Sequence, residues 1–217
     1  MKVNRKQKYF FTLVILLQFS FLCSQKDIIS QTNTFSIGIE GGVGSRSLSG
    51  SKIVYDHTES DFTYIAGISG QYSLTYNYSI KSGIYFQKKG AKKVNTITVG
   101  FPIKEFRLEY FTIPVMFKFA YGSNVKFFIN TGPYIGILLS ANEISYEPET
   151  YDIKNIFKSI DLGISGGIGL DIQIGNTKGI SLELRDDLGL LNTSDESYFL
   201  GGNVKNNTVN FILGFAY

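Results

Sequence analysis

The stretch Ile160–Ile174, IDLGISGGIGLDIQI, decides the fold class of this chain. Apolar residues occupy every second position from Ile160, interrupted only by Gly166, and the positions between them hold Asp, Gly, Ser and Gln. Side chains on a β-strand alternate between two faces, so the segment predicts a strand with one apolar wall and one small or polar wall, whereas a helix would mix the two sets. Its fifteen residues are many for a soluble sheet, but a tilted strand in a bilayer needs about 9–11 residues within the hydrocarbon. We therefore predict that the apolar wall faces lipid and that the polar wall lines a closed barrel.

Seven further segments alternate in the same way: 35–43, 62–76, 78–88, a segment whose clearest part is 111–121, 125–139, 180–190 and 208–217. Long loops at 44–61, 89–104, 141–157 and 192–207 alternate with short turns near 77, 122–124 and 175–179. In bacterial outer-membrane barrels the long loops are extracellular and the short turns periplasmic. The predicted fold is therefore all-β, an eight-stranded antiparallel up-and-down transmembrane β-barrel with four long extracellular loops and three short periplasmic turns. An open edge in hydrocarbon would leave backbone groups unpaired, so the first and last strands are expected to pair.

Two places depart from this regular alternation. Phe106, Leu108 and Tyr110 fall on the opposite parity to the apolar residues of 111–121, so we predict a β-bulge near Tyr110. Pro114, which cannot donate to a strand ladder, is unusual in the middle of a strand. Asp186 falls on the apolar parity of 180–190, which indicates either the membrane rim or a second bulge.

The composition fits a barrel and excludes a basic nucleic-acid-binding surface. Aromatic residues make up 15% of the 217 residues, and Gly is abundant at 23 while Pro is scarce at 4. The formal net charge of +3 depends on four basic residues within the first eight positions. Without them, 17 basic residues face 18 acidic ones, so no basic patch of the nucleic-acid kind remains.

The N-terminus has the layout of a secretory signal peptide. Lys2, Arg5, Lys6 and Lys8 precede the apolar run 9–23, and small and polar residues follow at Ser24 and Gln25. The predicted domains are a cleaved signal peptide at 1–24, a short periplasmic lead-in at 25–34 and an outer-membrane β-barrel domain at 35–217. An uncleaved N-terminal anchor is the alternative. Cys23, the only cysteine, follows Phe21-Leu22 and is a poor lipidation site, and cleavage near Ser24 would leave no cysteine for disulfides or thiolate metal ligands.

Charged residues occupy the inward positions of the predicted strands. An eight-stranded barrel has an interior just wide enough for side chains to fill, and buried charges are costly unless paired. Because both signs are present, we expect these residues to pair within a side-chain-filled interior, which argues against an open pore. They are Glu40, Lys81, Lys118, Lys126, Asp161, Asp171, Glu183, Arg185 and Asp187.

No pattern in the sequence indicates catalysis. His57 lies in the first long loop beside Asp56, Glu59 and Asp61, where a general base or a metal ligand is conceivable, but no second His or Cys accompanies it. Nucleophile-elbow, P-loop, HExxH and Rossmann fingerprints are all missing. We therefore expect no enzyme activity and no catalytic, cofactor-binding or metal-ligating residues. On the predicted loops, the basic run 88–93 suits solvent or lipopolysaccharide phosphates, and aromatic residues suit partner contact: Tyr146, Tyr151, Tyr198 and Phe199.

A soluble, ligand-carrying lipocalin-like barrel would show the same alternation with its apolar face turned inward. Three features favour the membrane barrel: apolar faces almost free of charge, opposite faces rich in Gly, and the ending Phe215-Ala216-Tyr217. A terminal aromatic residue on an amphipathic last strand resembles the signal read by the outer-membrane assembly machinery.

Two segments resemble a known family. Leu108-Glu109-Tyr110 with Ile113-Pro114, and Gly132-Pro133-Tyr134 on the next strand, are similar to matching stretches of the PorT-like outer-membrane β-barrel family of Bacteroidetes. The resemblance implies an eight-stranded barrel in the cell outer membrane and a tolerated proline at position 114. One family member takes part in type IX secretion. The resemblance therefore adds an accessory role in a type IX-like secretion system to the main expectation, which is a non-enzymatic barrel contacting partners or envelope components through its extracellular loops.

Overall fold

The computed structural model describes residues 34–50, 58–94, 103–145, 150–174, 178–194 and 203–217. The predicted signal peptide, the lead-in up to residue 33 and His57 lie outside the described residues. Among the described residues, none of the helical segments has the length and hydropathy of a transmembrane helix.

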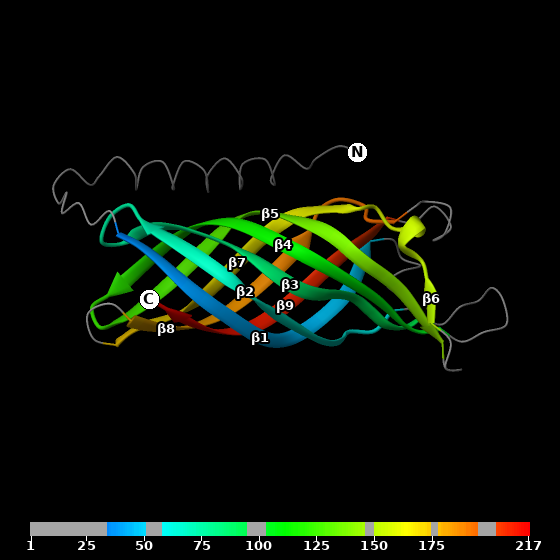
Figure 1. The fold of residues 1–217 in the computed structure, drawn as a ribbon, viewed down its shortest axis with the longest axis horizontal. Helices are drawn as coiled ribbons and strands as arrows, with labels where there is room; N and C mark the ends of the chain where they lie inside the picture. The colour runs from blue at the N-terminus through cyan, green and yellow to red at the C-terminus, as the bar shows by residue number, and fades with distance from the viewer. Residues whose placement is uncertain (1–33, 51–57, 95–102, 146–149, 175–177, 195–202) are drawn as a thin grey trace, which may run out of the picture. The chain divides into compact units, whose positions relative to one another are not determined.

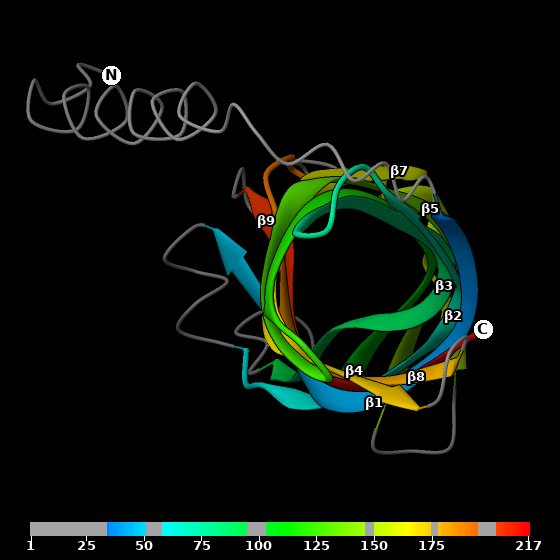
Figure 2. The ribbon, with the colours of Figure 1, turned by 90° about the vertical axis from the view of Figure 1, so that its left-hand side faces the viewer.

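Eight long antiparallel strands form the wall of a closed barrel (Figures 1 and 2). Each strand pairs with its neighbours along the chain, and the first pairs with the last from Gly38–Ala216 to Gly50–Val204. This closure confirms the predicted eight-stranded antiparallel barrel. The strands are β1 (Thr34–Gly50), β2 (Asp61–Ser73), β3 (Tyr78–Val94), β4 (Ile103–Gly122), β5 (Val125–Ser145), β7 (Ile160–Ile174), β8 (Lys178–Gly189) and β9 (Val204–Ala216).

The two ends of the barrel differ. We define the turn end as the end at which β1 begins and β9 ends, and at which the short connections 74–77 and 123–124 lie. The opposite end, the loop end, carries a three-residue strand β6 (Thr150–Asp152), which pairs with the far end of β5, and a single 3₁₀ turn η1 (Lys154–Ile156) (Figure 1). The strand bounds confirm the predicted alternation of long and short connections.

The strands extend farther toward the loop end than predicted. The strand predicted over Ile160–Ile174 has those bounds as β7, but β1 continues to Gly50, β3 to Val94 and β5 to Ser145, and β4 begins at Ile103. The predicted loops at 44–61, 89–104 and 141–157 were therefore too long. Past the lipid band the outward residues become polar, so the apolar alternation ends although the hydrogen-bonded ladder continues.

The outside of the barrel is apolar. On β7, Ile164 is 45% exposed and Ile168 is 58% exposed, whereas the charged residues of the same strand point inward. The alternative of a soluble barrel with an apolar interior is therefore wrong. Every wall strand contributes to the outer band: Ile39, Ile68, Ile84, Phe117, Ile129, Ile168, Leu184 and Phe211.

The irregularity predicted near Tyr110 exists, but its structure differs from the expectation. The β4–β5 register shifts between Glu109 and Tyr110, which confirms the position. The extra residue is Leu139 on β5, because Glu109 pairs with Ser140 and Tyr110 with Leu138. Phe106, Leu108 and Tyr110 keep one parity, face inward and are fully buried. The change of apolar parity in the sequence therefore marks an apolar interior.

Pro114 lies at an interruption of the β3–β4 ladder. Pairing runs to Ser82–Val115 and resumes at Tyr85–Thr112, so no ladder hydrogen bond is required from Pro114. The Ser82 hydroxyl donates to the Pro114 carbonyl at 2.8 Å. Asp186 has no such interruption beside it, since β8 pairs in continuous register with β7 and β9. A bulge at Asp186 was therefore the wrong alternative.

Candidate functional site: a charged interior with one open end

A cluster of four charged side chains, which we call the central cluster, occupies the middle of the barrel. It consists of Glu40, Lys81, Glu183 and Arg185 from β1, β3 and β8. Lys81 Nζ lies 2.9 Å from Glu40 and 2.7 Å from Glu183. Arg185 donates twice to Glu183, at 2.8 and 2.9 Å, and reaches Glu40 at 3.3 Å. Two cations and two carboxylates are thus fully paired, which offsets the cost of burying them.

Neutral donors complete the central cluster. The Tyr85 hydroxyl donates to Glu40 at 2.8 Å, and the Asn130 amide donates to Glu183 at 3.0 Å. The Arg185 guanidinium also lies 4.9 Å from the centre of the Tyr85 ring. The cluster therefore joins side chains from four strands and fills the cross-section between them.

Two more carboxylates lie on the loop-end side of the central cluster. Asp187 has no cationic partner among the described residues and accepts from Gln87, Ser165 and Thr208. Asp161 pairs with Lys89 at 3.0 Å and also accepts from Tyr134 and Asn206, both at 3.2 Å. Both oxygens of Asp187 therefore accept hydrogen bonds, whereas the three bonds to Asp161 all reach Oδ2, and its buried Oδ1 has no partner among the described residues.

The loop end of the interior is apolar. Its buried side chains form a contiguous cluster that we call the apolar plug, and residues of the β6–η1 segment close over it. The rings of Phe106 and Phe157 meet edge to face with centroids 6.4 Å apart. Backbone bonds hold the segment in place, from Ile153 N to the Ala141 carbonyl and from Lys158 N to the Thr193 carbonyl. The plug comprises Leu48, Ala91, Phe106, Leu108, Tyr110, Leu138, Ala141, Ile153, Phe157 and Val204.

A second ionic group, the loop-end cluster, surrounds Glu105. Arg46 Nη2 lies 2.5 Å from Glu105, Lys88 Nζ lies 2.8 Å from it, and Arg107 Nε lies 3.2 Å from it. Glu105 lies beyond Phe111, the last outward apolar residue of β4, and so outside the lipid-facing band. Burial raises the pKa of Glu105, but hydrogen bonds from the three cations outweigh burial. The pKa is therefore about 2, below its ordinary value of 4.5.

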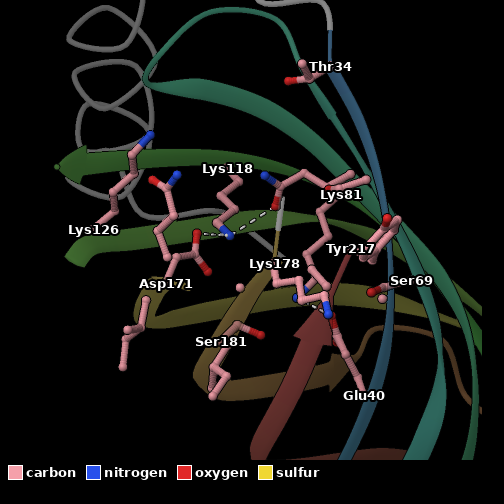
Figure 3. Close-up of a pocket in the computed structure, with 18 of the residues that line it drawn as sticks. Thr34, Glu40, Ser69, Lys81, Lys118, Lys126, Asp171, Lys178, Ser181 and Tyr217 are labelled. Carbon is pink, nitrogen blue, oxygen red and sulfur yellow. Dashed lines mark hydrogen bonds and ion pairs between the residues drawn. The ribbon is translucent and has the colours of Figure 1, made fainter. Parts of the chain in front are cut away.

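The turn end is open. A cavity of about 560 Å³, which we call the vestibule, has the side chains of Glu40 and Lys81 at its base and the mouth of the barrel at its rim (Figure 3). On its wall, Lys118 Nζ lies 2.6 Å from the Asp171 carboxylate and also donates to Gln71 Oε1 at 3.0 Å. The interior is thus filled in the middle and at the loop end, and the prediction of a wholly filled interior is wrong at the turn end.

The nine charges predicted to face inward all do so. Seven of them are in ion pairs; Asp187 is held by neutral donors, and Lys126 contacts the Tyr76 carbonyl at 3.4 Å. The basic run 88–93 was wrongly placed on a loop, because it belongs to β3 and Lys89 is fully buried. Arg46 was missed because it fell in the predicted loop 44–61, and Glu105 because it follows the predicted loop 89–104, before the clearest part of its strand. Among the described residues, no group of three or more His, Cys, Asp or Glu side chains is placed to hold a metal ion.

Comparison with known proteins agrees with the barrel. A family model described as outer membrane protein beta-barrel domain matches residues 9–195. The structure of Neisserial surface protein A is similar, with a TM-score of 0.52 and 10% identity over 84% of this chain and 95% of that chain. Outer membrane protein W of E. coli has a TM-score of 0.48 and 14% identity over 86% and 99% of the two chains. No curated protein matches the chain. Since the family model covers most of its length, the chain belongs to the outer membrane protein β-barrel domain family.

Proposed function

We propose that this protein is a non-enzymatic, non-conducting barrel that works through its loop end, where it contacts a partner or a component of the envelope outside the cell. In this orientation the long connections are extracellular, and the turn end with the strand termini faces the periplasm. The proposal gives the barrel the role of a rigid support for its extracellular rim.

The sealed interior is the observation that carries this proposal. A solute entering the vestibule meets the central cluster, in which Lys81 and Arg185 are each bonded to two carboxylates. Beyond it lies the apolar plug, in which Phe106 and Phe157 are nearly fully buried. The two layers of packed side chains favour a closed interior, in which contacts from outside the cell are confined to the rim.

The rim itself is suited to contact. Tyr151 on β6 is 51% exposed, and Lys154 and Lys158 beside it are exposed, while Ile153 and Phe157 anchor the same segment in the plug. An exposed tyrosine on a fixed backbone provides contact area at low entropic cost, and aromatic residues are enriched at interfaces. The predicted contact residues Tyr146, Tyr198 and Phe199 lie outside the described residues.

Two measurements test the proposal. In planar bilayers the purified barrel should give no channel steps, and regular conductance would overturn the non-conducting role. A photo-crosslinking residue in place of Tyr151 should give discrete adducts with an envelope or extracellular component in intact cells. The same residue in place of Ser36, at the turn end, should not give those adducts. If both positions give the same adducts, or if Tyr151 gives none, the loop end is not the contact surface.

A role in protein export is the second candidate, supported by the resemblance of the Gly132-Pro133-Tyr134 segment to PorT-like barrels. The segment has a structural use in any case, because Tyr134 donates to Asp161 in the interior. Affinity purification from solubilised membranes should retrieve secretion components if this role holds. Retrieval of the assembly machinery alone would instead reflect recognition of β9 and the residue that follows it, since Phe215 and Tyr217 are exposed.

A further inference from the structure

We propose that the vestibule at the turn end binds a small polyanion through phosphate or carboxylate oxygens. The inference goes beyond the role proposed for the loop end and depends on a different part of the molecule. The volume of the vestibule, about 560 Å³, falls within the range of small-molecule sites, about 300–1,000 Å³.

The charges that line the vestibule do not balance. Four lysines line it against two carboxylates: Lys81, Lys118, Lys126 and Lys178 against Glu40 and Asp171. At the base, Lys81 and Glu40 belong to the central cluster, whose four charges cancel. On the wall, Asp171 is the single acidic side chain within the part of the chain that the structure describes, and it is bonded to Lys118. Counted over the described side chains that line it, the vestibule therefore has two positive charges in excess, on Lys126 and Lys178.

These two lysines have only weak described contacts. Lys126 Nζ lies 3.4 Å from the Tyr76 carbonyl and 3.9 Å from the centre of its ring. Lys178 is exposed, and its Nζ lies 6.0 Å from the centre of the Tyr217 ring. Among the described residues neither has a carboxylate partner, although Lys126 is the register partner of Asp171. Both ammonium groups can therefore turn to an anion without breaking an ion pair.

The remaining lining supplies neutral donors around the two cations. Hydroxyl and amide groups come from strands on different sides of the mouth and from the β4–β5 turn: Ser36, Ser69, Gln71, Ser123, Asn124 and Ser181. Protein walls of low dielectric focus the field of charges within such a recess and raise the local concentration of anions. Two excess cations suit a ligand with two or more negative groups better than a single monovalent ion.

Access to the vestibule from the periplasm depends on the orientation proposed above, but binding itself does not. The test therefore uses the full-length barrel in detergent micelles, where both ends are open to solvent. Failure of this test leaves the proposed loop-end function untouched, and failure of the crosslinking test leaves the vestibule untouched.

The experiment is a titration followed by amide chemical shifts, at constant ionic strength, with inorganic phosphate and separately with citrate. We expect saturable chemical-shift changes concentrated at residues of the vestibule such as Asn124 and Gln173. The anion that binds with the higher affinity identifies the ligand class. In Lys126→Gln/Lys178→Gln the affinity should fall about fivefold or more, as expected for two lost charge contacts.

The matched control is Lys92→Gln/Lys158→Gln, which removes two exposed lysines at the loop end and should bind as the native protein does. Heat-modifiable gel mobility confirms that each variant is folded. Shifts that do not saturate, that spread over both ends of the barrel, or that are the same in Lys126→Gln/Lys178→Gln would overturn the proposal.

Discussion

The ammonium group of Lys89 lies 3.0 Å from the carboxylate of Asp161, and both side chains are completely shielded from solvent. The two residues come from β3 and β7, which do not pair, so their contact crosses the barrel interior. The ammonium group also lies 4.2 Å from the centre of the Tyr134 ring, whose hydroxyl donates to the same carboxylate. The pair therefore links the wall of the barrel across its width, just below the apolar plug.

Replacing Lys89 with Met should destabilise the barrel strongly. The change leaves the buried Asp161 carboxylate without its cation, and such losses cost about 3–5 kcal/mol. Urea unfolding in lipid vesicles measures the free energy of unfolding. Lys89→Met/Asp161→Asn, which removes both charges, should recover part of the loss. A loss under about 1 kcal/mol in Lys89→Met would show that the pair contributes little.

The lipid-facing part of the fold could be predicted from the sequence because hydrocarbon imposes a strict rule. Outward residues there are apolar with few exceptions, such as Asp186 on β8, so alternation identifies both the strand and its faces. Ile160–Ile174 is such a strand, and its predicted bounds and faces are those of β7. The nine inward charges were predicted for the same reason, since a charge on the opposite parity has only the interior to occupy.

The part of the barrel beyond the lipid band could not be predicted in this way. There the outer face meets water, and the inner face can be apolar, as with Phe106, or charged, as with Lys89 and Arg46. A strand segment with polar residues on its outer face and mixed residues on its inner face has the same composition as a loop, so the sequence alone does not identify it as a strand. The partner of each inward charge was also unpredictable, because pairing depends on the register between strands, as between Lys81 and Glu183, which are far apart in the chain.

The loop-end cluster predicts a dependence of stability on pH. The pKa of Glu105 is about 2 in the folded protein against an ordinary value of 4.5, since hydrogen bonds from three cations outweigh its burial. A lowered pKa contributes stability that is fully present above pH 4.5 and is lost as the pH falls toward 2. We therefore expect Glu105→Gln to be less stable than the native protein at pH 6, with the difference shrinking by pH 3.

Unfolding by urea at the two pH values measures this difference. The matched control is Glu109→Gln on the same strand, whose described side-chain partner is the Ser140 hydroxyl. It should shift stability by a similar small amount at both pH values. If the difference between Glu105→Gln and the native protein is the same at pH 6 and pH 3, the ionised carboxylate of Glu105 is not what stabilises the cluster.

Ile168 tests the lipid-facing band directly. It lies near the middle of β7, is 58% exposed and has Ile129 and Leu184 as its register partners on the adjacent strands. Ile168→Arg should therefore cost about 2–4 kcal/mol in vesicles, as charged residues do at the bilayer midplane. Ser45→Arg, at an outward and exposed position past Val43, the last outward apolar residue of β1, should cost about 0–1 kcal/mol. Equal costs at the two positions would contradict the assignment of the band.

Gly163 and Gly41 form a second matched pair, in which the same added methyl group should destabilise the barrel at the first position and not at the second. A Cβ atom on Gly163 would lie 2.1 Å from the Leu188 carbonyl oxygen and 2.4 Å from the Tyr134 ring, so strand or ring must move. Moving the ring would also disturb its hydrogen bond to Asp161, which ties the packing of this glycine to the buried ion pair. Overpacking of this kind typically costs about 1–3 kcal/mol.

On Gly41 the nearest atom to an added Cβ is the Ile65 carbonyl oxygen at 3.9 Å, an ordinary contact. Gly41→Ala should therefore be neutral or stabilise the barrel by about 0.4–1 kcal/mol, because alanine has fewer unfolded conformations to lose. Urea midpoints in vesicles compare the two variants with the native protein. If Gly163→Ala is as stable as Gly41→Ala, Tyr134 is not packed against the strand as the structure has it, and the contacts around Asp161 must be rearranged as well.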